Sequence, residues 1–149
     1  MNKDTAFLKL CDLLASKSPD PSRKTGAVIV DCWGDRVVAS GFNHIPGDLP
    51  VTEERLARPA KYKWIEHAER GAIYVCAAEG VPTAGCKMYL TWYPCADCAR
   101  AIVFAKISEL ICREPDWNDP KYDFEISREM LAEAGVVVRF VGKYEEVAA

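Results

Sequence analysis

Two short motifs hold the residues whose types and spacing could do chemistry. His67-Ala68-Glu69 stands at the start of one predicted helix, and Cys95 and Cys98 form a C-x-x-C pair at the start of the next. An imidazole and two thiolates suit zinc, and three protein ligands leave one tetrahedral position open, as a catalytic site requires. The motifs therefore predict a catalytic zinc ion bound by His67, Cys95 and Cys98.

The spacing within each motif supports this prediction. Cys95 and Cys98 are three residues apart, so the first turn of a helix brings their side chains to the same side. The positive end of the helix dipole also favours thiolate over thiol at both positions. Glu69 follows His67 by two residues and points at a different angle, so we expect it beside the ion and outside its ligand set.

Each motif alone is a weak signal, but H-x-E followed by P-C-x-x-C is typical of zinc-dependent nucleobase deaminases. In that chemistry Glu69 takes a proton from the attacking water, passes it to the ring nitrogen N3, and then protonates the departing amine. A structural zinc is the alternative, and it would need Cys86 or Cys112 as a fourth ligand. His44 is interpreted as a loop residue. The cysteines outside the pair are interpreted as small buried residues: Cys11, Cys32, Cys76, Cys86 and Cys112.

The rest of the chain predicts the elements that position these motifs. Hydrophobic periodicity indicates helices up to Ser18 and over 67–79, from Cys95 onward and over 124–134, with strands at 27–30, 36–39, 86–92, 107–112 and 136–141. The polar segment 45–63 suggests a short helix capped by Thr52. A helix between the last two strands implies a parallel crossover. We expect an α/β fold: a three-layer α/β/α sandwich with a mixed five-stranded sheet whose last two strands are parallel.

Composition and charge limit the function classes. With 149 residues, 50% of them hydrophobic and 28% charged, the chain fits one globular domain over 1–149. The formal charge is -3 and no basic run exceeds two residues, which argues against nucleic-acid binding but allows a small anionic ligand. The chain has no apolar run long enough to span a membrane and no secretory signal, so we expect a cytoplasmic protein.

Three segments beyond the motifs resemble the deoxycytidylate (dCMP) deaminases of the cytidine deaminase superfamily. They are residues 20–30, Gly41-Phe42-Asn43 and residues 64–70. The resemblance implies a cytidine deaminase-like fold and hydrolytic deamination of a cytosine nucleotide, dCMP to dUMP and ammonia, in pyrimidine metabolism. It also implies a homo-oligomer, commonly a hexamer.

The same resemblance implies roles for residues outside the zinc motifs. Asn43 would contact the sugar and Arg23 would help to bind the phosphate, with Lys24 a second candidate; the alternative for both cations is a solvated turn. Arg70 resembles an arginine that hydrogen-bonds the zinc thiolates in some relatives, and its alternative is a surface ion pair. Aromatic side chains that could wall a ring pocket are Trp92, Tyr93, Trp117 and Tyr122.

Other functions remain open at this point. A deaminase of a nucleoside or free base, such as deoxycytidine, cytosine or guanine, would need the same zinc motifs. An RNA adenosine deaminase is disfavoured by the acidic charge balance. The alternative outside the enzymes is a non-catalytic module that zinc only stabilises.

Overall fold

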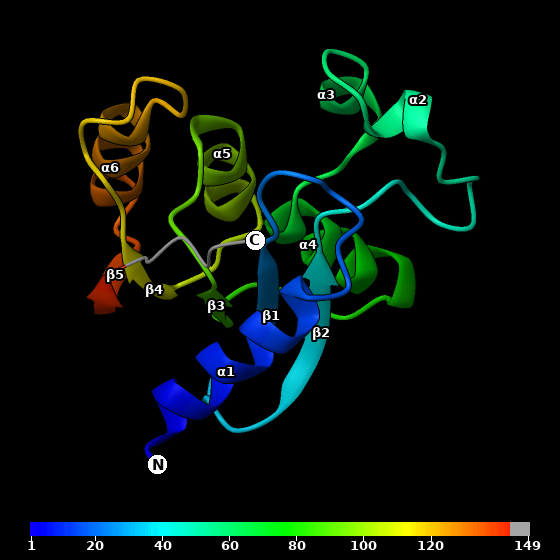
Figure 1. Cartoon of the computed structure of the whole chain (residues 1–149). Helices are drawn as coiled ribbons and strands as arrows, with labels where there is room; N and C mark the ends of the chain where they lie inside the picture. The colour runs from blue at the N-terminus through cyan, green and yellow to red at the C-terminus, as the bar shows by residue number, and fades with distance from the viewer. Residues whose placement is uncertain (144–149) are drawn as a thin grey trace.

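The computed structural model describes residues 1–143, which form six helices and five strands (Figure 1). The helices are α1 (Lys3–Ala15), α2 (Glu53–Leu56), α3 (Lys61–Trp64), α4 (Ala68–Glu79), α5 (Ala96–Phe104) and α6 (Phe124–Glu133). The strands are β1 (Gly26–Val30), β2 (Val37–Phe42), β3 (Lys87–Leu90), β4 (Glu109–Glu114) and β5 (Val137–Lys143). Within this range no helix combines the length and apolar character that spanning a bilayer requires.

The five strands form one mixed sheet in the order β2-β1-β3-β4-β5. β1 is antiparallel to β2 and β3, whereas β3, β4 and β5 are parallel to one another. Helix α1 packs on one face, and α4, α5 and α6 pack on the other (Figure 1). The expected three-layer sandwich with parallel last strands is confirmed, and the parallel part also includes β3.

Both faces of the sheet are covered by apolar side chains. The larger cluster, between the sheet and α4, α5 and α6, includes Ile29, Met88, Leu90, Ile102, Leu110 and Leu131. The smaller cluster, under α1, includes Leu8, Cys11, Val28, Tyr89 and Ile111. All five residues of β1 are buried because both faces of this strand are covered. Burial of each large aliphatic side chain contributes about 2 kcal/mol to folding.

The structure departs from the sequence-based expectations in two places. Helix α3, four residues long and without a side-chain cap, begins inside the segment 45–63, for which the sequence predicts only the short helix after Thr52, and ends one residue beyond it. Cys32 is exposed in the turn between β1 and β2, so its interpretation as a buried residue is wrong. Thr52 does cap α2 by accepting a hydrogen bond from the Arg55 backbone N–H, as expected.

Four strand ends meet at one edge of the sheet. Gly26, the first residue of β1, pairs with Phe42, the last of β2, and Ala27 pairs with Leu90, the last of β3. Because β4 is parallel to β3, its carboxyl end points to the same edge. The loops at these ends therefore lie near one another: residues 18–25, 43–52, 91–95 and 115–123.

Gly41 allows helix α4 to approach this edge. A Cβ atom at Gly41 would lie 2.6 Å from the carbonyl oxygen of Ala68, in the first turn of α4. A larger residue would push away the helix start that bears His67 and Glu69.

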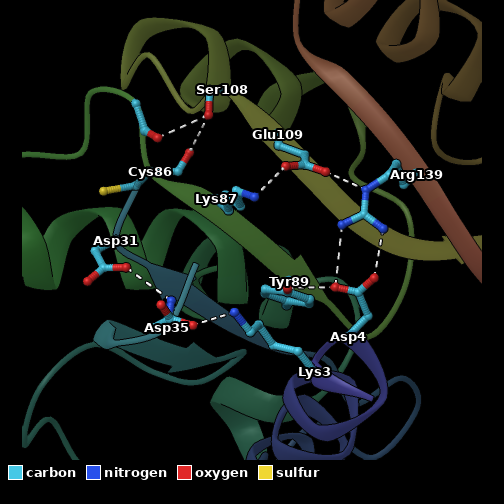
Figure 2. A network of polar contacts seen from close by, with 11 residues as sticks. Lys3, Asp4, Asp31, Asp35, Cys86, Lys87, Tyr89, Ser108, Glu109 and Arg139 are labelled. Atoms are coloured by element: carbon cyan, nitrogen blue, oxygen red, sulfur yellow. Dashed lines mark hydrogen bonds and ion pairs between the residues drawn. The ribbon is translucent and has the colours of Figure 1, made fainter. Parts of the chain in front are cut away.

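A polar network joins α1 to the sheet at the opposite edge (Figure 2). Arg139 on β5 donates to Glu109 on β4, and its Nη1 lies 2.7 Å from Oδ2 of Asp4 on α1. The hydroxyl of Tyr89 on β3 donates to Asp4 at 2.7 Å, and Lys87 pairs with Glu109 at 3.0 Å. The guanidinium group of Arg139 thereby links β5 to β4 and to α1, and β3 joins the network through the same two carboxylates.

We expect Arg139→Gln to lower the free energy of unfolding at pH 7 by about 1 kcal/mol, an effect limited by solvent exposure of the guanidinium. The hydrogen bond from Arg139 lowers the pKa of Asp4. Burial raises the pKa of Glu109, but hydrogen bonds from Arg139 and Lys87 lower it more. These depressed pKa values stabilise the fold above the unfolded pKa values of 3.8 and 4.5, and that stabilisation is lost as the pH falls through the folded-state pKa values.

Urea unfolding at pH 7 and at pH 3 measures this effect. The difference between the variant and the wild type should shrink at pH 3. Lys9→Gln, an exposed change on the same helix, serves as the control and should not alter stability. A difference that is as large at pH 3 as at pH 7 would contradict the electrostatic explanation.

Candidate active site

Three side chains at the starts of two helices form a metal-ligating cluster. His67 directly precedes α4, Cys95 directly precedes α5, and Cys98 lies in the first turn of α5. Nδ1 of His67 lies 3.3 Å from Sγ of Cys98 and 3.5 Å from Sγ of Cys95. In tetrahedral zinc sites, Zn–S bonds of about 2.3 Å and Zn–N bonds of about 2.0 Å separate such atoms by about 3.5 Å. The donor set and its spacing therefore fit zinc.

The surroundings of the cluster favour a bound cation. The Cys95 thiolate accepts hydrogen bonds from the Cys98 thiol and from His67, and these lower the pKa of Cys95 to about 4. The contact with Cys95 raises the pKa of both His67 and Cys98. Neither His67 nor Cys95 caps its helix through its side chain, so both side chains are available to the cluster. A metal cation can take the place of the protons through which His67 and Cys98 contact the Cys95 thiolate.

Among residues 1–143, the cluster has no fourth ligand group from a histidine, cysteine or carboxylate side chain. Cys86 and Cys112, the candidates for a structural fourth ligand, are buried in the larger apolar cluster instead. His44 lies with Nδ1 2.7 Å from the carbonyl oxygen of Phe42 and is also outside the metal-ligating cluster. This arrangement favours a catalytic zinc site over a structural one.

Glu69 lies beside the cluster without being one of its ligand groups. Its side chain starts in the first turn of α4, is 5% exposed, and lines the same cavity as His67 and Cys95. Burial raises the pKa of Glu69, and the charge of His67 acts in the opposite direction. A carboxyl group with a raised pKa is suited both to accept and to donate a proton.

Arg70 connects the two zinc motifs electrostatically. Its Nε lies 2.6 Å from Oε1 of Glu66, and its Nη1 lies 3.9 Å from Oδ2 of Asp97 on α5. Burial opposes the charged form, but the charge of Cys98, the hydrogen bond to Glu66 and the charges of Glu66 and Cys95 together raise the pKa of Arg70. Arg70 thus lies close enough to both sulfurs to stabilise negative charge on them, while its hydrogen bond goes to Glu66.

A cavity of about 480 Å³ opens next to the cluster, a size that suits a small ligand. Its walls come from the loops at the shared sheet edge and from the segment around α3. Aromatic lining is provided by Tyr62, Trp92, Tyr93 and Tyr122. Of the four aromatic residues expected to wall a ring pocket, Trp117 alone is not part of this lining.

A buried ion pair forms part of the cavity wall, and sequence analysis missed it. Lys61 is 5% exposed, and its Nζ lies 3.0 Å from Oδ1 of Asp20. Oδ1 of Asp20 also accepts from the backbone N–H of Ser22, and Oδ2 lies 3.5 Å from Nδ2 of Asn43. No periodic pattern relates positions 20 and 61, so only the fold could reveal this pair.

Asn43 lines the cavity and also organises the loop before β1. Its Oδ1 accepts from the backbone N–H of Thr25 at 2.8 Å, and its Nδ2 donates to the carbonyl oxygen of Arg23 at 2.8 Å. The second proton of Nδ2 points toward Asp20. The amide therefore holds residues 20–25 against the end of β2.

Arg23 and Lys24 occupy different environments. The Arg23 guanidinium stacks on Trp92, 3.3 Å from the ring centroid, lies 4.9 Å from that of Tyr122, and lines the cavity. Lys24 is exposed and is not among the cavity-lining residues. The structure thus brings Arg23, but not Lys24, to the site that holds Glu69.

Comparison with known proteins adds to this picture. A family model described as the cytidine and deoxycytidylate deaminase zinc-binding region matches residues 1–114. The deoxycytidylate deaminase of Mus musculus is 32% identical over 150 residues, covering 95% of this chain and 81% of the mouse protein. A protein of Aliivibrio fischeri described as an uncharacterized deaminase in luxG 3'region is 31% identical over 141 residues, covering 91% of this chain and 90% of that protein.

A solved structure shares the fold. The dCMP deaminase of cyanophage S-TIM5, in complex with dCMP and dUMP, matches with a TM-score of 0.74 and 23% identity, covering 92% of this chain and 95% of the phage protein. The two chains therefore share the same overall fold.

Proposed function

Because this chain belongs to the cytidine and deoxycytidylate deaminase family and is thus a zinc-dependent hydrolytic deaminase, we propose that it converts dCMP and water to dUMP and ammonia. The observation that carries this proposal is the cavity that joins the His67, Cys95 and Cys98 cluster to Glu69 and to a group of cationic side chains. The product would make the enzyme part of pyrimidine nucleotide metabolism.

In the proposed mechanism, His67, Cys95 and Cys98 hold the zinc ion, which when bound supplies a Lewis acid that makes a water molecule more acidic. Glu69 accepts a proton from the water whose oxygen attacks C4 of the cytosine ring. It donates this proton to N3, which completes a tetrahedral intermediate. The second proton of the water passes through Glu69 to the exocyclic amine, the C4–N bond breaks, and ammonia leaves as the C4 carbonyl forms.

Other residues would bind and orient the substrate. The aromatic side chains of Trp92, Tyr93 and Tyr122 present apolar surface to the flat ring and exclude water from Glu69. We propose that Asn43 contacts the sugar and that Arg23 contributes to phosphate binding, with Lys24 a weaker candidate because it lies outside the cavity lining. Arg70 would hold negative charge on the two sulfurs.

We also propose that the chain acts as one domain over 1–149, as a homo-oligomer and in the cytoplasm. Support for one domain comes from the single sheet that residues 1–143 form. The exposed apolar side chains of Tyr74, Phe104 and Ile126 on three helices offer surface that subunit contacts could bury.

A substrate panel tests the proposal. Purified protein should release ammonia from dCMP, with loss of the cytosine absorbance, at a kcat/KM well above that for deoxycytidine, cytosine, CMP or guanine. Preferred reaction with guanine, cytosine or deoxycytidine would contradict the nucleotide assignment while leaving the deaminase chemistry in place. No reaction with any of these compounds, in protein that contains zinc, would favour a non-catalytic module.

A further inference from the structure

The cavity mouth carries two cations that the mechanism above does not use. Four cationic side chains line the cavity: Arg23, Arg58, Lys61 and Lys121. Lys61 is buried against Asp20, and Arg23 is stacked on Trp92. Arg58 and Lys121 are exposed, so they face both the cavity and the solvent. These two are the cations best placed to meet an anionic group that enters from outside.

Arg58 is tied to the loop that contains Arg23. It lies between α2 and α3, and its Nη2 donates to Oγ of Ser22 at 3.2 Å. Ser22 also lines the cavity, and its hydroxyl can donate its own proton to a further acceptor. A guanidinium and a hydroxyl held side by side form a recognition surface for phosphate oxygens.

Lys121 comes from the segment between β4 and α6, on a different wall of the cavity. Burial raises the pKa of the neighbouring Tyr122, the charge of Arg23 lowers it, the charge of Asp119 raises it, and the charge of Arg58 lowers it more weakly. Arg58 and Lys121 both line this cavity, together with Tyr122. The two exposed cations therefore belong to one mouth.

Acidic groups at the cavity do not cancel this charge. Asp20 is paired with Lys61, and Asp97 is paired with Arg100 at 2.6 Å. Glu69 lies at the reacting end of the cavity beside the metal ligands. Of the four acids that line the cavity, Asp123 is the one that is exposed and has no ion pair among the described residues. In a chain with a net charge of -3, the mouth is locally cationic.

We propose that Arg58 and Lys121 bind the 5'-phosphate of the substrate and so determine the preference for a nucleotide over a nucleoside. This inference rests on the proposed function and names residues that act at the same site. The cytosine ring lies at Glu69 and the phosphate lies at the mouth between the two walls. Arg58 donates in the plane of its guanidinium, Lys121 supplies a second charge from the other wall, and Ser22 and Arg23 complete the surface.

The experiment compares dCMP with deoxycytidine, which has the same ring and sugar but lacks the phosphate. Arg58→Gln, Lys121→Gln and the double variant are assayed with both substrates. Each single change should lower kcat/KM for dCMP about tenfold, mainly through KM, and the double change about 100-fold. The kcat/KM for deoxycytidine should stay at the wild-type value, which a distorted site would not allow.

Lys63→Gln is the matched control, because Lys63 is exposed on α3 but does not line the cavity. It should behave as wild type with both substrates. Inorganic phosphate provides a readout that does not depend on turnover of dCMP: it should inhibit deoxycytidine deamination in the wild type and more weakly in the double variant. Raising the ionic strength should increase KM for dCMP more in the wild type than in the double variant.

The outcomes separate this inference from the proposed function. Wild-type protein that prefers dCMP, combined with a double variant that keeps the same preference, would overturn the assignment of Arg58 and Lys121 alone. Wild-type protein that does not prefer dCMP over deoxycytidine would overturn the proposed function as well. Zinc content and circular dichroism show whether the double variant folds. If it does not, the Lys121→Gln variant alone is used, and the measurement is again whether the preference for dCMP over deoxycytidine falls or stays at the wild-type value.

Discussion

Glu69→Gln is expected to abolish deamination of dCMP while the protein stays folded and keeps its zinc. Glutamine has nearly the same shape as glutamate but can neither accept the proton of the attacking water nor deliver a proton to the leaving amine. A positioned acid or base typically accounts for a factor of about 10² to 10⁴ in rate, and in the proposed mechanism one carboxyl group serves in both steps. We therefore expect kcat to fall by about 10⁴-fold or more, with a small change in the binding of dCMP.

Metal analysis and thermal unfolding of the same preparation show whether the loss is chemical. The zinc content should remain at one ion per chain, since Glu69 is not among the cluster residues, and the midpoint of unfolding should be no lower than in the wild type. Glu79→Gln, an exposed change at the far end of the same helix, is the control and should keep full activity. A Glu69→Gln protein that retains more than a tenth of the wild-type kcat would show that another group moves the protons.

The second large effect concerns the metal ligands. Cys98→Ser and His67→Ala should each lose zinc and all measurable activity, because two protein ligands do not retain the ion in a water-filled cavity. Loss of an ion present at about 1,000 times its dissociation constant removes about 4 kcal/mol of stability, or about 10 °C in the midpoint of unfolding for a chain of this size. The fully buried position of Cys98 adds to the effect of that substitution.

Other cysteine variants serve as controls for this prediction. Cys32→Ser, an exposed change far from the cluster, should retain zinc and activity. Cys86→Ser and Cys112→Ala should also retain zinc, although their buried positions will cost some stability. Zinc loss from a folded preparation of either of the last two variants, as complete as that from Cys98→Ser, would instead indicate a fourth protein ligand and a structural site.

The layer order and the position of the metal motifs could be predicted from sequence because local patterns specify both. Apolar periodicity marks α1, α4 and α6, and Gly80 in the left-handed conformation ends α4 where the pattern stops. His67 and Cys95 directly precede helices, and their ligand chemistry predicted that the two motifs meet at one metal ion, whereas the order of the strands that brings them together was not predicted. In the structure that order is β2-β1-β3-β4-β5.

The substrate end of the cavity could not be predicted in the same way. The pair Lys61 and Asp20, and the cations Arg58 and Lys121, come from loops and short helices whose courses depend on tertiary packing. Arg23 was a candidate through family resemblance, but its stacking on Trp92 joins residues with no periodic relation. Lys24, its sequence neighbour, points elsewhere because adjacent residues in an extended loop face different ways.

The central claim is that one imidazole and two thiolates hold a zinc ion with a position left for chemistry. X-ray absorption at the zinc edge of the purified wild-type protein tests it most directly. We predict a spectrum with two sulfur scatterers and otherwise only lighter atoms, one of them from the imidazole of His67. A zinc environment with three or four sulfurs, or purified active protein without zinc, would contradict the account.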